Sequence, residues 1–406
     1  MLWAAAAVGV SHLVQSTRAG GEYGFGLALI ILVTLVLKYP FFDYGPRYAA
    51  ATGESLVEGY AKIGRWALWL YLLLTLATAM IVWSAILLFT AFLTNYTLGL
   101  GWPIPVTSTV LLIGCALLLK VGRFRALDRS VKAIMALLAI STLVAATAAL
   151  PRADFSTVTL FPTAVDWSVA RFGFLLALVG WMPSAIDVAV WSSLWTLAKD
   201  ESSGERTSVD MARLDFGIGY WGSAVLAYGF LALGATVMYD SGTSFSPQGT
   251  AFSVQLIDLY AQTLGNWARP IVLVAVLTTM LSTTLTVVDG FPRAIERSAE
   301  RLGPNRTSLL SSAGGGRLYW ISYAALSLVT IIVLSRFIGS FTAMIDFATT
   351  LSFLTAPILG YLNLRAVTSP DVPPADRPSR AMLAISWLGV VVLGGTGIAY
   401  LIWRSF

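Results

Sequence analysis

The sequence has few of the residues that soluble enzymes and metalloproteins rely on. It contains one cysteine and one histidine among 406 residues. Cys115 therefore has no partner for an intramolecular disulfide, and His12 by itself excludes zinc motifs that need two histidines. No G-x-x-x-x-G-K phosphate loop occurs, which argues against an ATP-driven pump. Charged residues make up only 12% of the chain, about half the share found in an ordinary soluble domain. We expect neither an enzyme nor a bound cofactor.

The sequence is instead rich in long apolar runs. Hydrophobic residues make up 57% of it, and its mean hydropathy is +0.77. Backbone polar groups in hydrocarbon must be satisfied within the protein, and runs of this length favour helices over a barrel. The sequence thus predicts an all-α membrane protein in contact with the lipid bilayer. About eleven transmembrane helices are expected, near 2–19, 25–50, 66–94, 103–120, 131–150, 170–197, 214–239, 268–292, 317–337, 340–364 and 382–403.

The basic residues predict how the chain is oriented. The net charge is +5, and lysines and arginines gather in the connections after the second, fourth, sixth, eighth and tenth spans. The positive-inside rule then places the N-terminus in the cytoplasm and the C-terminus outside, in a bacterial inner membrane. Because the orientation in the membrane explains the basic residues, no nucleic-acid partner is expected. The sequence does not indicate an oligomeric state.

Two of the expected helices are interrupted. Val8-Gly9-Val10-Ser11-His12 breaks the first apolar run, and Val179-Gly180-Trp181-Met182-Pro183-Ser184 breaks the sixth. Five helices separate the two breaks, a pattern typical of a five-plus-five inverted repeat whose broken helices face a midplane substrate cavity. The predicted units are residues 1–150 (first repeat), 165–365 (second repeat) and 380–406 (an extra helix). Gly and Pro are also common in membrane helices, which is the plainer explanation.

Several motifs resemble those of the Nramp family of divalent-metal transporters. That family has a leucine-transporter-like fold and couples metal uptake to protons (symport). The resemblance implies the same fold and a secondary transporter that works by alternating access. The similar segments are Ser16–Phe25 (STRAGGEYGF), Ala51-Thr52-Gly53, Met182-Pro183, Ser192-Ser193-Leu194, Ser282-Thr283-Thr284 and Gly290-Phe291.

The chain departs from the family at its metal motif. Where the family's first break carries Asp-Pro-Gly-Asn, whose Asp and Asn bind the metal, this chain has Gly9-Val10-Ser11-His12. The family's methionine is kept as Met182, whereas its following histidine is replaced by Ser184. The family's third helix carries carboxylates of the proton route, yet no charged residue occurs between Ala67 and Leu98. The resemblance thus implies the scaffold and leaves metal specificity and proton coupling open.

The two breaks supply the candidate binding residues. An altered metal site would combine the His12 imidazole, the Met182 thioether, the Asp187 carboxylate and the carbonyl groups of Gly9 and Val179, because imidazole and thioether ligands select transition metals. The alternative is a structural hydrogen bond that joins His12 to Asp187 or Gln15. The full set of predicted substrate-binding residues is Gly9, Ser11, His12, Gln15, Val179, Met182, Ser184 and Asp187.

Other ionisable residues within the spans require an explanation, because each costs about 3 kcal/mol or more in a membrane helix. Asp187, Asp289 and Asp346 are candidates for proton or ion coupling. Asp289 can instead pair with Arg293 four residues later, whereas Asp346 has no local partner. Lys38 is expected to neutralise Asp43 or to extend towards the membrane surface. In the connection 240–267, a short interfacial helix is expected, with an apolar stripe of Phe252, Leu256, Leu259 and Tyr260.

Three functions are compatible with these observations. The leading hypothesis is transport of a divalent transition metal with an altered ligand set. The second keeps the scaffold and moves a neutral, organic or anionic solute, because loss of the first-helix Asp reduces negative charge in the site. The third is a membrane sensor that does not transport.

Overall fold

A computed structural model describes residues 7–121, 124–159, 167–239, 241–242, 244–303, 315–336 and 339–405. Within these ranges every regular element is helical, as the sequence predicts. The elements are η1 (Ser11–Ser16), α2 (Thr17–Tyr23), α3 (Ala28–Thr52), α4 (Leu56–Ile63), α5 (Arg65–Leu98), α6 (Ile104–Val121), α7 (Phe124–Ala149), η2 (Leu150–Arg152), η3 (Phe155–Thr157), α8 (Val169–Gly180), α9 (Asp187–Ser203), α10 (Val209–Val237), α11 (Gly249–Leu264), α12 (Ala268–Leu302), α13 (Arg317–Arg336), α14 (Phe341–Val367), η4 (Pro374–Asp376) and α15 (Arg380–Ser405).

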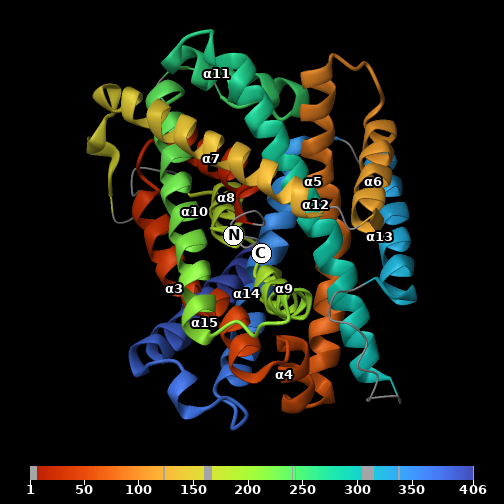
Figure 1. Cartoon of the computed structure of the whole chain (residues 1–406). Coiled ribbons are helices and arrows are strands. Elements are labelled where there is room, and N and C mark those ends of the chain that lie inside the picture. Colours follow the sequence, from red (N-terminus) through yellow and green to blue (C-terminus); the bar gives the residue numbers. More distant parts are fainter. Residues whose placement is uncertain are drawn as a thin grey trace.

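The long helices form a bundle with α11 at one end and α4 at the other (Figure 1). In the described part of the chain, seven helices are long and apolar enough to cross a membrane: α3, α5, α10, α12, α13, α14 and α15. Three shorter apolar helices accompany them, at Ile104–Lys120, Ala136–Arg152 and Val169–Gly180. Many large apolar side chains on the outer helices are exposed, such as Val391 and Ile398 of α15. These are the surfaces that a lipid bilayer would cover.

Both predicted helix breaks are present. Val8 and Gly9 form a bend after the helical residue Ala7, and the chain then continues as the π-helix η1 and the α-helix α2. The sixth predicted span is divided into α8 and α9, and residues 181–186 between them are not helical. Peptide groups at both breaks are therefore released from regular helical hydrogen bonding.

Close helix crossings at glycine bring the broken elements into the bundle. A Cβ atom on Gly20 of α2 would lie 2.0 Å from the carbonyl oxygen of Leu231 in α10, and one on Gly234 would lie 2.1 Å from that of Thr17. At the end of α8, a Cβ atom on Gly180 would lie 2.0 Å from the carbonyl oxygen of Thr349 in α14. Glycine is required at these positions because the two backbones touch.

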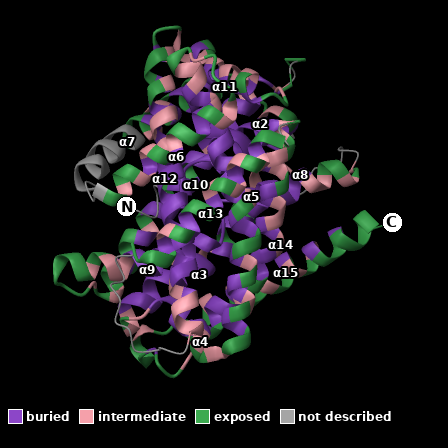
Figure 2. Ribbon diagram, turned by 90° about the vertical axis from the view of Figure 1, so that its right-hand side faces the viewer, coloured by how far each residue is buried: buried purple, intermediate pink, exposed green. Residues whose placement is uncertain are grey.

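Burial concentrates in the centre of the bundle, with exposed residues more frequent at its ends (Figure 2). The interfacial helix predicted in the connection 240–267 is α11, and its predicted stripe of Phe252, Leu256, Leu259 and Tyr260 is 0–2% exposed. This stripe packs onto the protein, because Phe252 contacts the aromatic rings of Phe89 and Phe341.

Candidate functional site

A hydrogen bond joins the two helix breaks. The hydroxyl group of Ser11 donates to the carbonyl oxygen of Pro183 at 3.0 Å and thereby joins the first break to the sixth. The hydroxyl group of Thr283, on α12, donates to the carbonyl oxygen of Val8 at 2.9 Å. One released carbonyl at each break is therefore satisfied by a hydroxyl group of another segment, which fixes both breaks against their neighbours.

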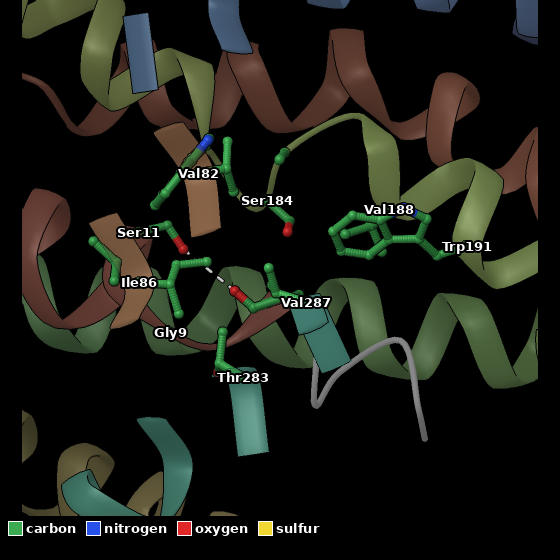
Figure 3. Close-up of a pocket in the computed structure, with 13 residues that line it drawn as sticks. Gly9, Ser11, Val82, Ile86, Ser184, Val188, Trp191, Thr283 and Val287 are labelled. Carbon is green, nitrogen blue, oxygen red and sulfur yellow. Dashed lines mark hydrogen bonds between the residues drawn. The ribbon is translucent and has the colours of Figure 1, made fainter. Parts of the chain in front are cut away.

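A small cavity lies beside this junction (Figure 3). Its volume is about 20 Å³, room for roughly one water molecule or one ion without its hydration shell. Ser11, Ser184 and Thr283 give the cavity hydroxyl groups, and Gly9 lies on its wall. The remaining lining is apolar apart from the indole nitrogens of two tryptophans, and no charged side chain belongs to it among the described residues.

His12 does not belong to the lining of this cavity. One ring nitrogen, Nδ1, lies 2.8 Å from the Ser11 hydroxyl oxygen, and the other, Nε2, lies 2.9 Å from the carbonyl oxygen of Ser223 in α10. Both nitrogens are therefore engaged, and the ring is fully buried. The imidazole thus links η1 to α10. The hydrogen bond to Asp187 or Gln15, which the sequence offered as the alternative to a metal site, is not formed among the described residues.

Met182 and Asp187 are buried near the sixth break without lining the cavity. Neither carboxylate oxygen of Asp187 has a hydrogen-bond partner among the residues that the structure describes, although the residue is 1% exposed. No group of three His, Cys, Asp or Glu side chains that could hold a metal occurs among the described residues. In this conformation His12, Met182 and Asp187 are thus not gathered around one point.

The carbonyl oxygen of Val179 is occupied by a lysine. Lys38 Nζ, from α3, lies 3.1 Å from it, 2.9 Å from the carbonyl oxygen of Gly180 and 3.3 Å from that of Ser184. The prediction that Lys38 neutralises Asp43 or reaches the membrane surface is wrong, because Lys38 is fully buried in the break. Asp43 pairs with Arg47 instead, at 2.6 Å.

Gln15 and Asp346 meet on the α11 side of the cavity. Asp346, on α14, accepts hydrogen bonds from Arg18 at 2.7 and 3.2 Å, and Gln15 Nε2 donates to the same carboxylate at 3.0 Å. The sequence indicated no local partner for Asp346, and the structure shows that its partner, Arg18, lies 328 positions away in the chain. Arg18 is a functional candidate that the sequence analysis missed, although it lies within the motif STRAGGEYGF.

Asp289 forms the ion pair with Arg293 that the sequence offered as the alternative to a role in coupling. Its carboxylate pairs with Arg293 at 2.8 Å and accepts hydrogen bonds from the hydroxyl group of Tyr319 at 2.9 Å and from the indole of Trp195 at 3.0 Å. The carboxylate thus connects α12 to α13 and α9.

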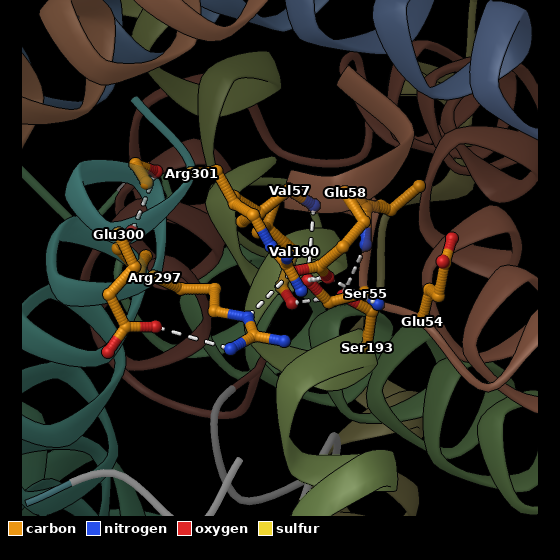
Figure 4. Close-up of polar contacts among 12 residues, drawn as sticks. Glu54, Ser55, Val57, Glu58, Val190, Ser193, Arg297, Glu300 and Arg301 are labelled. Atoms are coloured by element: carbon orange, nitrogen blue, oxygen red, sulfur yellow. Dashed lines mark hydrogen bonds and ion pairs between the residues drawn. The ribbon is translucent and has the colours of Figure 1, made fainter. Parts of the chain in front are cut away.

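A second polar cluster, also missed from the sequence, closes the α4 end of the bundle (Figure 4). Glu58 of α4 accepts from Arg297 Nε at 2.6 Å and from Arg301 Nε at 2.7 Å, both on α12. It also completes a capping box with Ser55. Burial raises the pKa of Glu58, but the two arginines and Ser55 outweigh it and hold that pKa below its ordinary value. A cavity of about 210 Å³ lies beside Glu58 and Lys62.

Comparisons with known proteins agree with the family resemblance of the sequence. The family described as natural resistance-associated macrophage protein-like (Nramp) matches residues 1–403. The chain belongs to the Nramp family. This Nramp protein is 35% identical over 398 residues to an uncharacterized protein, PM0681, of Pasteurella multocida (strain Pm70), across 97% of this chain and 88% of the relative.

Solved structures share the fold. A manganese transporter of Eremococcus coleocola matches with a TM-score of 0.68 at 15% identity, over 98% of this chain and 84% of that one. MhsT in complex with L-phenylalanine matches with a TM-score of 0.60 at 16% identity, over 99% and 96%. The predicted leucine-transporter-like fold with broken first and sixth helices is thus confirmed. With its long apolar helices, this Nramp protein is an integral membrane protein.

Proposed function

We propose that this Nramp protein is a secondary transporter that moves a divalent transition metal by alternating access, and that the ion binds between the two helix breaks. The main support is the cavity at the junction of Ser11 and Pro183, whose 20 Å³ volume suits a single ion rather than an organic molecule. The similar fold of a transporter whose title names manganese agrees with this cargo.

The proposed ligand set differs from an acidic metal motif. The hydroxyl oxygens of Ser11, Ser184 and Thr283 already surround the cavity. Asp187, one turn after Ser184, supplies the negative charge that a divalent cation requires, because its carboxylate is buried and lacks a hydrogen-bond partner in the described structure. His12, Met182 and the Gly9 carbonyl join this set when the breaks rearrange during transport. The Val179 carbonyl joins it only after leaving Lys38.

The proposal extends to the two halves of the chain and their orientation. Residues 1–150 and 165–365 would be the inverted repeats that move against each other, with 380–406 as an added helix, and the N-terminus would face the cytoplasm of a bacterium. The proposal also includes proton coupling, for which the candidate residues are Asp187, Asp289 and Asp346. Asp289 and Asp346 are each held by an arginine, so a proton carried by either requires that its ion pair opens first.

A non-metal solute is the second candidate. No charged side chain lines the cavity in the described structure, and the Lys38 ammonium at the sixth break adds positive charge nearby. Both features favour a neutral or anionic solute over a divalent cation. MhsT, which has a similar fold, is seen with L-phenylalanine, so the scaffold accommodates cargo of that size.

Binding and uptake distinguish these candidates. Under the metal proposal, isothermal titration detects Mn²⁺ binding to the purified protein, proteoliposomes take up Mn²⁺, and His12→Ala and Asp187→Ala both reduce uptake. Ser16→Ala is the matched control, because in the described structure the Ser16 hydroxyl group donates to the Ser11 carbonyl, within its own segment. Absence of Mn²⁺ binding, together with thermal stabilisation by an organic solute, would favour the second candidate.

Alternating access separates a transporter from a sensor. Single cysteines at Ser11 and Ser184, introduced after Cys115→Ala, should react with membrane-impermeant reagents from one side at a time. Accessibility that never changes with substrate would support the sensor hypothesis.

A further inference from the structure

Lys38 makes an unusual set of contacts for an intramembrane lysine. Its ammonium group lies 2.9–3.3 Å from three main-chain carbonyl oxygens, those of Val179, Gly180 and Ser184. The residue is fully buried, and it forms no salt bridge in the described part of the chain. The ring of Phe42 lies 5.6 Å from Nζ and offers its π-face.

These carbonyl groups form a site suited to a small cation. They become available because α8 ends at Gly180 and the regular hydrogen bonding of its last carbonyls stops there. The Val179 carbonyl oxygen keeps one amide donor, the N–H group of Met182 at 3.3 Å, and uses its remaining lone pair for Lys38. The same end carries the negative pole of the helix dipole. Oxygens from the end of α8 and from the break itself converge on one point, since Val179 and Gly180 precede the non-helical segment and Ser184 lies within it.

We propose that the sixth-helix break contains a monovalent-cation site and that Lys38 fills it as a tethered cation. The ammonium group then replaces a free ion such as ammonium or potassium. It holds the end of α8 against the non-helical segment and positions Ser184, which lines the small cavity. Burial of a charged group without an acidic partner is costly in a membrane protein, and the three carbonyl contacts offset that cost.

Occupancy by a side chain has a specific consequence. A protein that bound a free ion here would depend on the ions in its surroundings, whereas this chain carries its own. Removal of the side chain beyond Cβ should expose the carbonyl site and leave space for a free cation. Replacement by an apolar chain of similar length should fill the space and exclude one.

Lys38→Ala and Lys38→Met are therefore a matched pair. The unfolding temperature of each purified variant is measured while methylammonium or potassium chloride replaces choline chloride at constant ionic strength. We expect both variants to be less stable than wild type in choline. Lys38→Ala should gain about 5 °C at saturating methylammonium, whereas wild type and Lys38→Met should not respond. If Lys38→Ala responds to no cation, or if Lys38→Met responds equally, the proposal is wrong.

A folding defect would not obscure the result. If Lys38→Ala cannot be purified in choline, expression and purification in methylammonium replace the titration. Recovery of folded Lys38→Ala but not Lys38→Met supports the proposal, and recovery of neither or of both overturns it.

Uptake adds a test that rests on the proposed function. Metal uptake by wild type should be equal in choline, sodium and potassium, and uptake by Lys38→Ala should require methylammonium or potassium. If wild type takes up no metal while the thermal response of Lys38→Ala is present, the proposed cargo fails and the cation site stands.

Discussion

The guanidinium group of Arg18 holds the carboxylate of Asp346 at two points, 2.7 and 3.2 Å, and so ties α2 to α14. Arg18 lies two helical turns beyond Ser11, the residue that joins the breaks, on the side of α11. The ring of Phe174, on α8, lies under the same guanidinium group, and its centroid is 4.6 Å from the Arg18 Cζ atom. The pair therefore links α2, α8 and α14 at one place in the bundle.

Loss of this pair should loosen the α11 end of the bundle. We expect Arg18→Gln to lower the free energy of unfolding by about 2 kcal/mol, less than for a fully buried pair because Asp346 keeps some solvent contact. A cysteine at Ser11, with Cys115→Ala, should react faster with a reagent applied from the α11 side. Exposed Arg336→Gln is the control and should change neither quantity. Unchanged labelling of the Arg18 variant would show that other contacts close this end.

Asp187 should be more important for transport than for stability. Its carboxylate is buried without a hydrogen-bond partner in the described structure, and such a charge destabilises the fold. Asp187→Asn should therefore raise the free energy of unfolding by about 1 kcal/mol while reducing uptake at least roughly tenfold. Exposed Asp210→Asn should affect neither. A variant that transports normally would remove Asp187 from the mechanism.

Glu58 should make stability depend on pH. The pKa of Glu58 is lower in the folded protein than its ordinary value, so its contribution is present above the unfolded-state pKa, about 4.3. That contribution is lost as the pH falls through the folded-state pKa. Glu58→Gln should cost about 2 kcal/mol at neutral pH, and the difference from wild type should shrink below about pH 4. Unfolding temperatures across this range provide the measurement.

Glu54→Gln is the matched control for Glu58. Glu54 pairs with Lys62 at the surface of the same region, and exposed pairs contribute about 0–1 kcal/mol. An equal effect of the two substitutions would show that the α4–α12 contact does not depend on the buried carboxylate.

Gly20→Ala should displace α2 from α10. The added Cβ atom would lie 2.0 Å from a main-chain oxygen, which no rotamer can relieve. We expect loss of several kcal/mol or failure to fold, measured as the yield of monodisperse protein. Gly222→Ala in α10 is the control, because its Cβ atom meets nothing within 4 Å. If Gly20→Ala is as stable as wild type, the two helices are not in backbone contact.

Local features were predictable from the sequence, and long-range pairings were not. The breaks near Gly9 and Gly180 were predicted correctly because glycine and proline act on the backbone within one turn. The α11 helix followed from the spacing of Phe252, Leu256, Leu259 and Tyr260. By contrast, the predicted partner of Lys38 was wrong. Spacing suggested Asp43, five residues later, but the ammonium group contacts main-chain oxygens, which no side-chain pattern reveals.

The sequence by itself determined that the chain is helical, lies in a membrane and interrupts its first and sixth helices, because hydrophobic length and backbone stereochemistry are encoded locally. Only the tertiary structure decided that His12 bonds Ser223, that Arg18 holds Asp346 and that Lys38 enters the sixth break. These contacts join residues more than a hundred positions apart, and a polar group within a membrane takes whichever partner the packed helices bring to it.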